Sequence, residues 1–151
     1  MKTLSAMGMK RRETLHPNIQ QVLDKALADD LDITLLYGHR TPQEQYEIWC
    51  QGRTKPGAIV THKDGIKDKS MHNYFPSLAM DIALFDSSST PVDWKDLSRF
   101  FYLGGRIVQI ARDLKIPMRW LGDADGDTNI KEEKFIDLPH FELIVLASEL
   151  K

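Results

Sequence analysis

The chain has 151 residues, a length that corresponds to about one domain with a single hydrophobic core. Its formal charge of −2 at pH 7 provides no cationic surplus to neutralise a phosphate backbone, so the composition argues against a nucleic-acid partner. Hydrophobic residues make up 42% and charged residues 28%, proportions typical of globular proteins that exclude a disordered or fibrous chain.

The first half of the chain predicts two helices around one strand. Apolar residues recur at helical spacing over about 18–29, after a proline placed for a first turn. A β-branched and apolar run over 32–38 ends at a glycine and predicts a strand. Thr41-Pro-Gln-Glu44 has the form of a capping box, so a second helix is expected over 41–51. Residues 52–70 lack a hydrophobic period and predict a long surface loop.

The second half predicts three more strands and a long helix. Strands are expected over 78–85, 117–121 and 140–145, and a helix over about 94–114. The last two strands are close enough in sequence to pair as a hairpin. The predicted fold class is α+β, with helices packed on a small, mostly antiparallel sheet.

The sequence contains few features that indicate where in the cell the protein is located. No stretch approaches the roughly 20 apolar residues of a membrane span, and the N-terminal segment lacks the apolar core of a signal peptide. We therefore expect no membrane insertion, no signal peptide, and a protein kept in the cytoplasm unless another factor releases it. Cys50 is the single cysteine, which excludes a multi-thiolate zinc site.

Three residues near predicted strands suit a catalytic metal. His72 lies just before a strand, Asp81 lies within that strand, and His140 opens the last one. Two histidines and a carboxylate, with a fourth position left for water, form the ligand set of a catalytic zinc ion. Asp137 precedes His140 by three residues across a Leu-Pro pair, so a turn would present its carboxylate as general base.

Four segments of the chain resemble one enzyme family. Two contain the residues above, Ser70-Met-His72-Asn-Tyr-Phe-Pro-Ser-Leu-Ala79-Met-Asp81 and Asp137-Leu-Pro-His140-Phe-Glu-Leu143. The other two are Tyr37-Gly-His-Arg40-Thr-Pro-Gln-Glu-Gln45 with Gln51-Gly-Arg-Thr54, and Trp120-Leu-Gly-Asp123. Over about residues 15–145 the chain resembles the zinc D,D-carboxypeptidase and L-alanyl-D-glutamate peptidase family, particularly its phage endolysin members.

The resemblance implies a hedgehog and D,D-peptidase-like fold and assigns roles to residues. Zn²⁺ would be held by His72, Asp81 and His140, with Asp137 as the catalytic base. Arg40 would be catalytic as well, binding substrate and steadying the oxyanion. In the same way Ser70 would help to bind substrate.

One departure from the family concerns spacing. The common pattern has six residues between the first histidine and the aspartate, whereas eight separate His72 from Asp81. The longer spacing with a Pro-Ser element is similar to that of phage-type members, so Asp81 is kept as the ligand. Asp86 is the fallback.

The acidic loop before the last strand leaves two alternatives open. Asp123-Ala-Asp125-Gly-Asp127 resembles part of a calcium loop, because alternating carboxylates can converge on a hard cation. The spacing departs from an EF-hand, with glycine at the fourth position and Lys134 at the twelfth. The loop is therefore either solvated or a Ca²⁺ site.

The resemblance implies a single zinc peptidase domain over 1–151 that cuts peptidoglycan stem peptides, between L-alanine and D-glutamate in the endolysin members. A D-Ala-D-Ala carboxypeptidase and a non-catalytic zinc-containing binding module are the alternatives. The presence of both Asp137 and Arg40 argues against the binding module. We expect a monomer that stays in the host cytoplasm until a holin admits it to the periplasm and cell wall, where it lyses the host.

Overall fold

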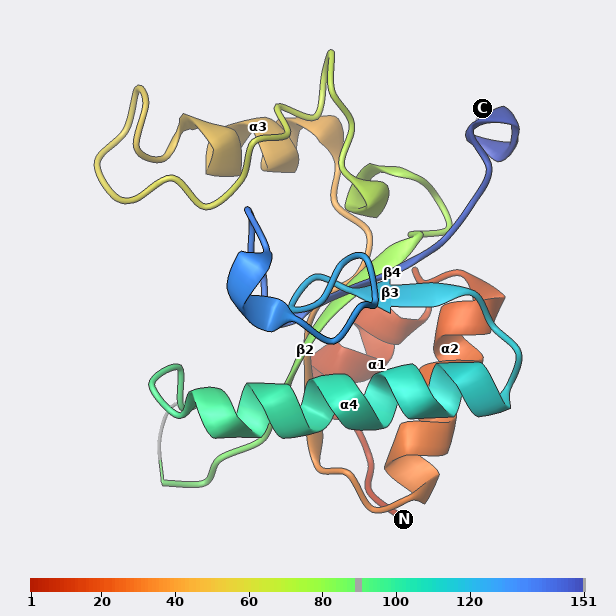
Figure 1. Cartoon of the computed structure of the whole chain (residues 1–151). Helices are drawn as coiled ribbons and strands as arrows, with labels where there is room; N and C mark the ends of the chain where they lie inside the picture. Colours follow the sequence, from red (N-terminus) through yellow and green to blue (C-terminus); the bar gives the residue numbers. More distant parts are fainter. Residues whose placement is uncertain (89–90, 151) are drawn as a thin grey trace.

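The computed structural model describes residues 1–88 and 91–150, in which helices pack around one sheet (Figure 1). The elements are α1 (Ala6–Arg12), α2 (Pro17–Ala28), β1 (Ile33–Tyr37), α3 (Pro42–Cys50), η1 (Met71–Asn73), β2 (Ala79–Leu84), α4 (Leu97–Asp113), β3 (Met118–Trp120), η2 (Ile130–Glu132), β4 (His140–Leu143) and η3 (Ala147–Glu149). Within these described ranges, no helix has the length and apolar character needed to cross a membrane.

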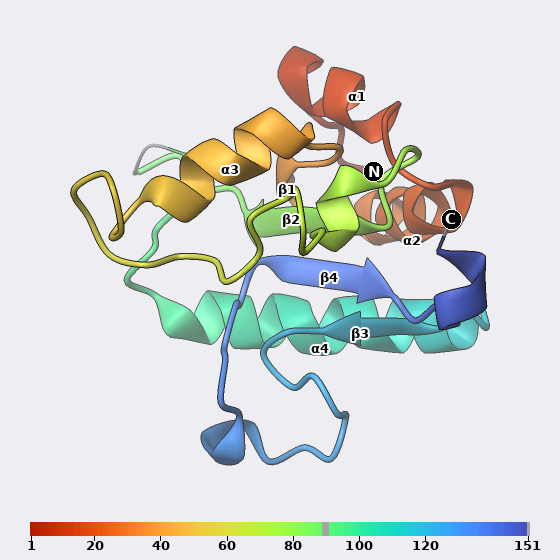
Figure 2. The same cartoon turned by 90° about the horizontal axis from the view of Figure 1, so that it is seen from above.

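The sheet has the strand order β1-β2-β4-β3, and each neighbouring pair is antiparallel. Helix α4 runs along one face of the sheet, while α3 and the long loop after it lie on the other side (Figures 1 and 2). The predicted α+β class is confirmed, as is the pairing of the last two strands. In the register of β2 and β4, Asp81 lies directly opposite His140.

Local signals explain where the predicted helices begin. The capping box before α3 is formed, because Thr41 Oγ1 accepts from the amide of Glu44 and the Glu44 carboxylate accepts from the amide of Thr41. Helix α4 begins at Leu97 rather than near 94, since Asp96 caps it. Helix α1 was not predicted. Its one buried residue is Gly8, so the segment has no apolar stripe to reveal it.

Alternation along the strands separates a core face from a polar face. One face packs with α2 and α4 into the main core, which includes Ile33, Leu35, Met80, Ile82, Ile107, Met118, Phe141 and Leu143. The opposite face forms the floor of a groove of about 1390 Å³, to which the strands contribute Thr34, Leu36, Asp81, Arg119, His140 and Glu142. The sheet therefore brings polar residues of all four strands together on one side.

A β-bulge changes the direction of one side chain at the edge of this groove. The register of β1 with β2 shifts between Leu35 and Tyr37. Regular alternation would place Tyr37 on the same side as Leu35, in the core. The extra residue instead turns Tyr37 to the groove, where its ring lies 4.6 Å from the guanidinium carbon of Arg40.

Candidate metal centre and active-site groove

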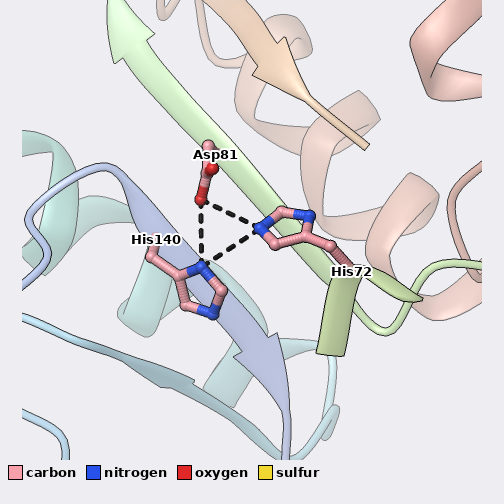
Figure 3. A group of neighbouring side chains, drawn as sticks. All are labelled: His72, Asp81 and His140. Atoms are coloured by element: carbon pink, nitrogen blue, oxygen red, sulfur yellow. Dashed lines mark hydrogen bonds and ion pairs between the residues drawn. The ribbon is translucent and has the colours of Figure 1, made fainter. Parts of the chain in front are cut away.

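Three buried side chains converge on the floor of the groove (Figure 3). His72 is presented by η1, Asp81 by β2 and His140 by β4. Asp81 Oδ1 lies 3.2 Å from His72 Nε2 and 3.0 Å from His140 Nδ1, and the two ring nitrogens are 3.2 Å apart. The three residues predicted as metal ligands are thus neighbours in space.

The outer hydrogen bonds of the two histidines decide which nitrogens face the centre. His72 Nδ1 lies 2.7 Å from the carbonyl oxygen of Gly38, so this nitrogen carries the proton and donates. His140 Nε2 lies 2.8 Å from Glu142 Oε2 and donates in the same way. In the neutral rings, His72 Nε2 and His140 Nδ1 therefore direct lone pairs toward Asp81 Oδ1.

Three acceptors that face one another require a cation between them. Zinc bonds of about 2.0–2.1 Å in a tetrahedron place the ligand atoms about 3.3 Å apart. The observed separations of 3.0–3.2 Å fit that geometry. The residues present therefore fit a zinc ion, which His72, Asp81 and His140 would hold at the floor of the groove.

The electrostatics of the cluster lead to the same conclusion. Burial opposes a charge on His140, but hydrogen bonds to Asp81 and Glu142 outweigh burial and raise the pKa of His140 to about 10. Burial likewise opposes ionisation of Asp81, yet both histidines together hold the pKa of Asp81 well below its ordinary range. Without a metal a proton takes the place of the cation, so metal binding releases it.

Asp137 lines the same groove and is held beside His140 by a turn. The amide of His140 donates to the carbonyl of Asp137 at 3.1 Å, and the amide of Asp137 donates to the carbonyl of Leu121 at 3.0 Å. Burial, followed by the charge of Asp81, raises the pKa of Asp137. A carboxyl with a raised pKa near a metal site is suited to accept and return a proton.

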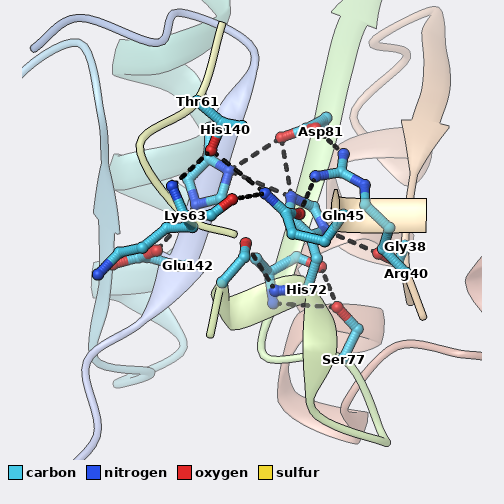
Figure 4. Close-up of polar contacts among 12 residues, drawn as sticks. Gly38, Arg40, Gln45, Thr61, Lys63, His72, Ser77, Asp81, His140 and Glu142 are labelled. Carbon is cyan, nitrogen blue, oxygen red and sulfur yellow. Dashed lines mark hydrogen bonds and ion pairs between the residues drawn. The ribbon is translucent and has the colours of Figure 1, made fainter. Parts of the chain in front are cut away.

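Arg40 is buried beside the cluster and held from several sides (Figure 4). Its Nη1 donates to Gln45 Oε1 at 2.8 Å, and its Nη2 lies 3.4 Å from Asp81 Oδ2. The Tyr37 ring packs against the guanidinium. Within the described residues Arg40 Nε has no hydrogen-bond partner. The side chain is therefore fixed in the groove next to the metal ligands.

Ser70 and Asp86 differ in their relation to the site. Ser70 lines the groove, and it also caps η1, since its Oγ accepts from the amide of His72 at 3.3 Å. Its position thus supports the loop that carries the first ligand. Asp86 lies beyond the end of β2 and 3.7 Å from Arg99, outside the cluster. Asp81 is the carboxylate that lies beside both histidines, and its role as a metal ligand stays a prediction.

The three aspartates of the acidic loop also lie close together, with carboxylate oxygens within 4.8 Å of one another. They accept hydrogen bonds from amides of their own loop, such as that of Thr128 to Asp123 at 3.2 Å and that of Asn129 to Asp127 at 2.7 Å. These bonds suit a loop that is ordered by its own carboxylates. Calcium binding here stays a prediction.

Glu142 is expected to tune metal affinity through His140. It lies between His140 and Arg119, which donates to it from the opposite strand at 2.7 Å. Glu142→Gln should weaken zinc binding about 10–100-fold, because a neutral amide accepts more weakly from the histidine. Competition with a chromophoric chelator measures this, with the exposed Glu13→Gln as control. Equal affinities for both variants would contradict the role.

Asp137 is expected to reduce the stability of the metal-free fold. Its raised pKa means that the folded carboxyl holds its proton to higher pH than the unfolded one, whose pKa is about 3.9. Ionisation therefore destabilises the fold as pH rises above that value. With chelator present, Asp137→Asn should melt above wild type at about pH 7, and the difference should vanish near pH 3. A lower melting temperature for the variant at neutral pH would refute this.

Two residues of the site were missed by sequence reasoning. Tyr37 reaches the groove through a bulge, which leaves no mark on the hydrophobic pattern. Gln45 is fully buried beside Arg40. It follows Thr41 by one turn and shares a helix face with Trp49, so a polar residue on an apolar face was the available signal.

The fold and the site together fit a metal-dependent hydrolase, since acceptor atoms suited to zinc meet a further carboxylate in an open groove. Comparison with known proteins makes the class specific. The sequence pattern of the phage L-alanyl-D-glutamate peptidases matches residues 1–144. The chain belongs to this family, and the resemblance drawn from its motifs is confirmed.

Individual proteins agree with this assignment. The peptidoglycan L-alanyl-D-glutamate endopeptidase CwlK of Bacillus subtilis (strain 168) is 35% identical over 139 residues, which cover 86% of this chain and 74% of CwlK. The structure of the Serratia marcescens L-Ala D-Glu endopeptidase ChiX has a TM-score of 0.69 at 19% identity, covering 95% of this chain and 90% of ChiX. The vancomycin resistance D,D-dipeptidase VanXYg has a TM-score of 0.51 at 18% identity, covering 90% of this chain and 53% of VanXYg. At these identities both structures show a shared fold.

Proposed function

We propose that the protein is a zinc peptidase that hydrolyses the stem peptide of bacterial peptidoglycan between L-alanine and D-glutamate. One observation carries the proposal: the facing acceptor atoms of His72, Asp81 and His140 lie in a groove that Asp137 also lines. The choice of bond follows the relatives CwlK and ChiX, both of which are L-alanyl-D-glutamate endopeptidases. The structure supplies the residues that would cut it.

The proposed chemistry assigns one task to each group. A zinc ion held by the three ligands would supply Lewis-acid polarisation of the scissile carbonyl and of water. Asp137 takes the proton of the attacking water and passes it to the leaving amine. Arg40, fixed next to Asp81, faces negative charge that develops on the carbonyl oxygen or a carboxylate of the substrate. Ser70 at the groove wall contacts the peptide.

The shape of the groove favours an endopeptidase. Besides the three candidate ligands, its lining includes Thr34, Trp94, Phe135 and lysines of the 52–70 loop, and its volume is about 1390 Å³. A groove of this size has room for a peptide that continues beyond the cleaved bond. A carboxypeptidase needs a closed end that captures a terminal carboxylate.

The family suggests the setting in which the protein acts. We propose a monomeric phage endolysin that accumulates in the host cytoplasm. A holin would then open the way to the cell wall, where cleavage of stem peptides causes lysis.

The test is digestion of purified Gram-negative peptidoglycan, followed by mass spectrometry of the released ends. New N-terminal D-glutamate that depends on zinc supports the proposal. Released D-alanine would instead identify the carboxypeptidase. No cleavage by zinc-loaded protein would favour the binding module.

A further inference from the structure

Gln45 connects the arginine of the site to the loop that forms the groove wall (Figure 4). Its side chain is fully buried, and all three of its close polar contacts come from other parts of the chain. The Oε1 atom accepts from Arg40 at 2.8 Å. The Nε2 atom donates to Thr61 Oγ1 at 3.2 Å and to the carbonyl oxygen of Lys63 at 2.9 Å. One amide therefore holds the guanidinium with its oxygen and the loop with its nitrogen.

The anchored segment is the part of the loop that faces another wall of the groove. His62 lies between the two residues that Gln45 holds, and its ring is 5.5 Å from that of Phe135, which comes from the loop between β3 and β4. Both rings line the groove. The position of segment 61–63 therefore sets the distance between the two walls.

The loop also closes tightly over Gln45. Gly65 has a φ of +77°, and a Cβ built there would come within 2.6 Å of Gln45 Cβ. A glycine is thus required for the chain to approach this closely. Gln45 is covered on its loop side and joined to Arg40 on the other, which leaves it no alternative partner in water.

We infer that Gln45 is a positioning residue that sets the wall of the groove and the guanidinium of Arg40 in one fixed relation. Its effect on catalysis rests on the function proposed above, since it acts through Arg40 and through the width of the substrate groove. Its effect on the loop does not depend on any substrate.

Two substitutions separate the halves of this role. In Gln45→Glu the carboxylate still accepts from Arg40 but cannot donate to Thr61 or Lys63. In Gln45→Met the side chain keeps a similar size but loses its hydrogen bonds both to Arg40 and to the loop. Gln43→Met on the exposed face of the same helix is the matched control. Thr61→Ala removes one of the two Gln45 contacts, together with the hydrogen bond that Thr61 Oγ1 accepts from the amide of Lys63 at 3.1 Å, and keeps the Gln45 bond to the Lys63 carbonyl. It serves as a milder variant should Gln45→Met fail to fold.

Limited trypsin digestion of each variant reports on the loop, which contains Lys63, Lys67 and Lys69 as cleavage sites. Loss of two hydrogen bonds should accelerate cleavage within 61–69 about tenfold in Gln45→Glu and Gln45→Met. Thr61→Ala should show a smaller increase, and Gln43→Met none. Resistance of Gln45→Glu equal to that of the control would overturn the inference.

Steady-state hydrolysis of peptidoglycan reports on Arg40. Gln45→Glu should raise KM several-fold with kcat within about threefold of wild type, because the guanidinium keeps its acceptor. Gln45→Met should lower kcat as well. Equal kcat values for the two variants would overturn the link to Arg40. If wild type cleaves no peptidoglycan, the proposed function fails, while the trypsin result still tests the anchoring of the loop.

Discussion

Asp137→Asn is expected to reduce hydrolysis of peptidoglycan about 10²–10⁴-fold while zinc binding is retained. The amide has the shape of the carboxyl but cannot accept the proton of the attacking water. The three ligands on η1, β2 and β4 should remain in place. The contacts of 3.0–3.2 Å that join them involve only His72, Asp81 and His140, and the Asp137 side chain takes no part in them. Initial rates and zinc content per chain are the two measurements.

The matched control for this variant is Asp113→Asn, an exposed aspartate at the end of α4 that does not line the groove. It should keep both activity and zinc. If Asp137→Asn retained wild-type rates, the general base would have to be another group. If it lost zinc instead, Asp137 would belong to the ligand set.

Removal of the metal should abolish activity and lower the melting temperature by roughly 8–16 °C. Zinc at a thousand times its Kd stabilises the folded state by about 4 kcal/mol, and each kcal/mol corresponds to about 2–4 °C for a chain of this size. The physical reason is the set of facing acceptors around Asp81, which a bound cation would hold together. Thermal scans with chelator, and after zinc is restored, measure the effect.

His72→Ala provides the matching variant. It leaves Asp81 and His140 as two ligands, so added zinc should give little stabilisation and little activity. A wild-type protein that melts at the same temperature with and without chelator would exclude the site as a zinc centre.

The sequence predicted most of the elements, since their signals are local. The capping box of α3, the alternation of the strands and the apolar stripe of α4 each follow from neighbouring residues. Helix α1 was missed because it has seven residues and buries only a glycine. Short elements of this kind are stabilised by tertiary contacts that a local pattern does not contain.

The ligand residues were predicted from motif resemblance, and only the register of the strands explains their meeting. Asp81 and His140 are opposite each other on β2 and β4, although 59 positions separate them in sequence. The stretch of eight residues between His72 and Asp81 is likewise explained by contacts with a distant part of the chain. Ser77, within the extra stretch, pairs with the chain between α1 and α2, where its amide donates to the Thr14 carbonyl at 2.8 Å.

Sheet and loops divide the labour of this active site, and that division makes the enzyme suitable for redesign. The reactive groups stand on strands and on turns tied to them, whereas the groove walls come from residues 52–69 and 121–136. Exchanging these loops between homologues should change which peptidoglycan stem peptides the groove accepts, while the metal centre on the strands stays as it is. A grafted loop would need to keep acceptors at positions 61 and 63, so that the transplant remains tied to Gln45.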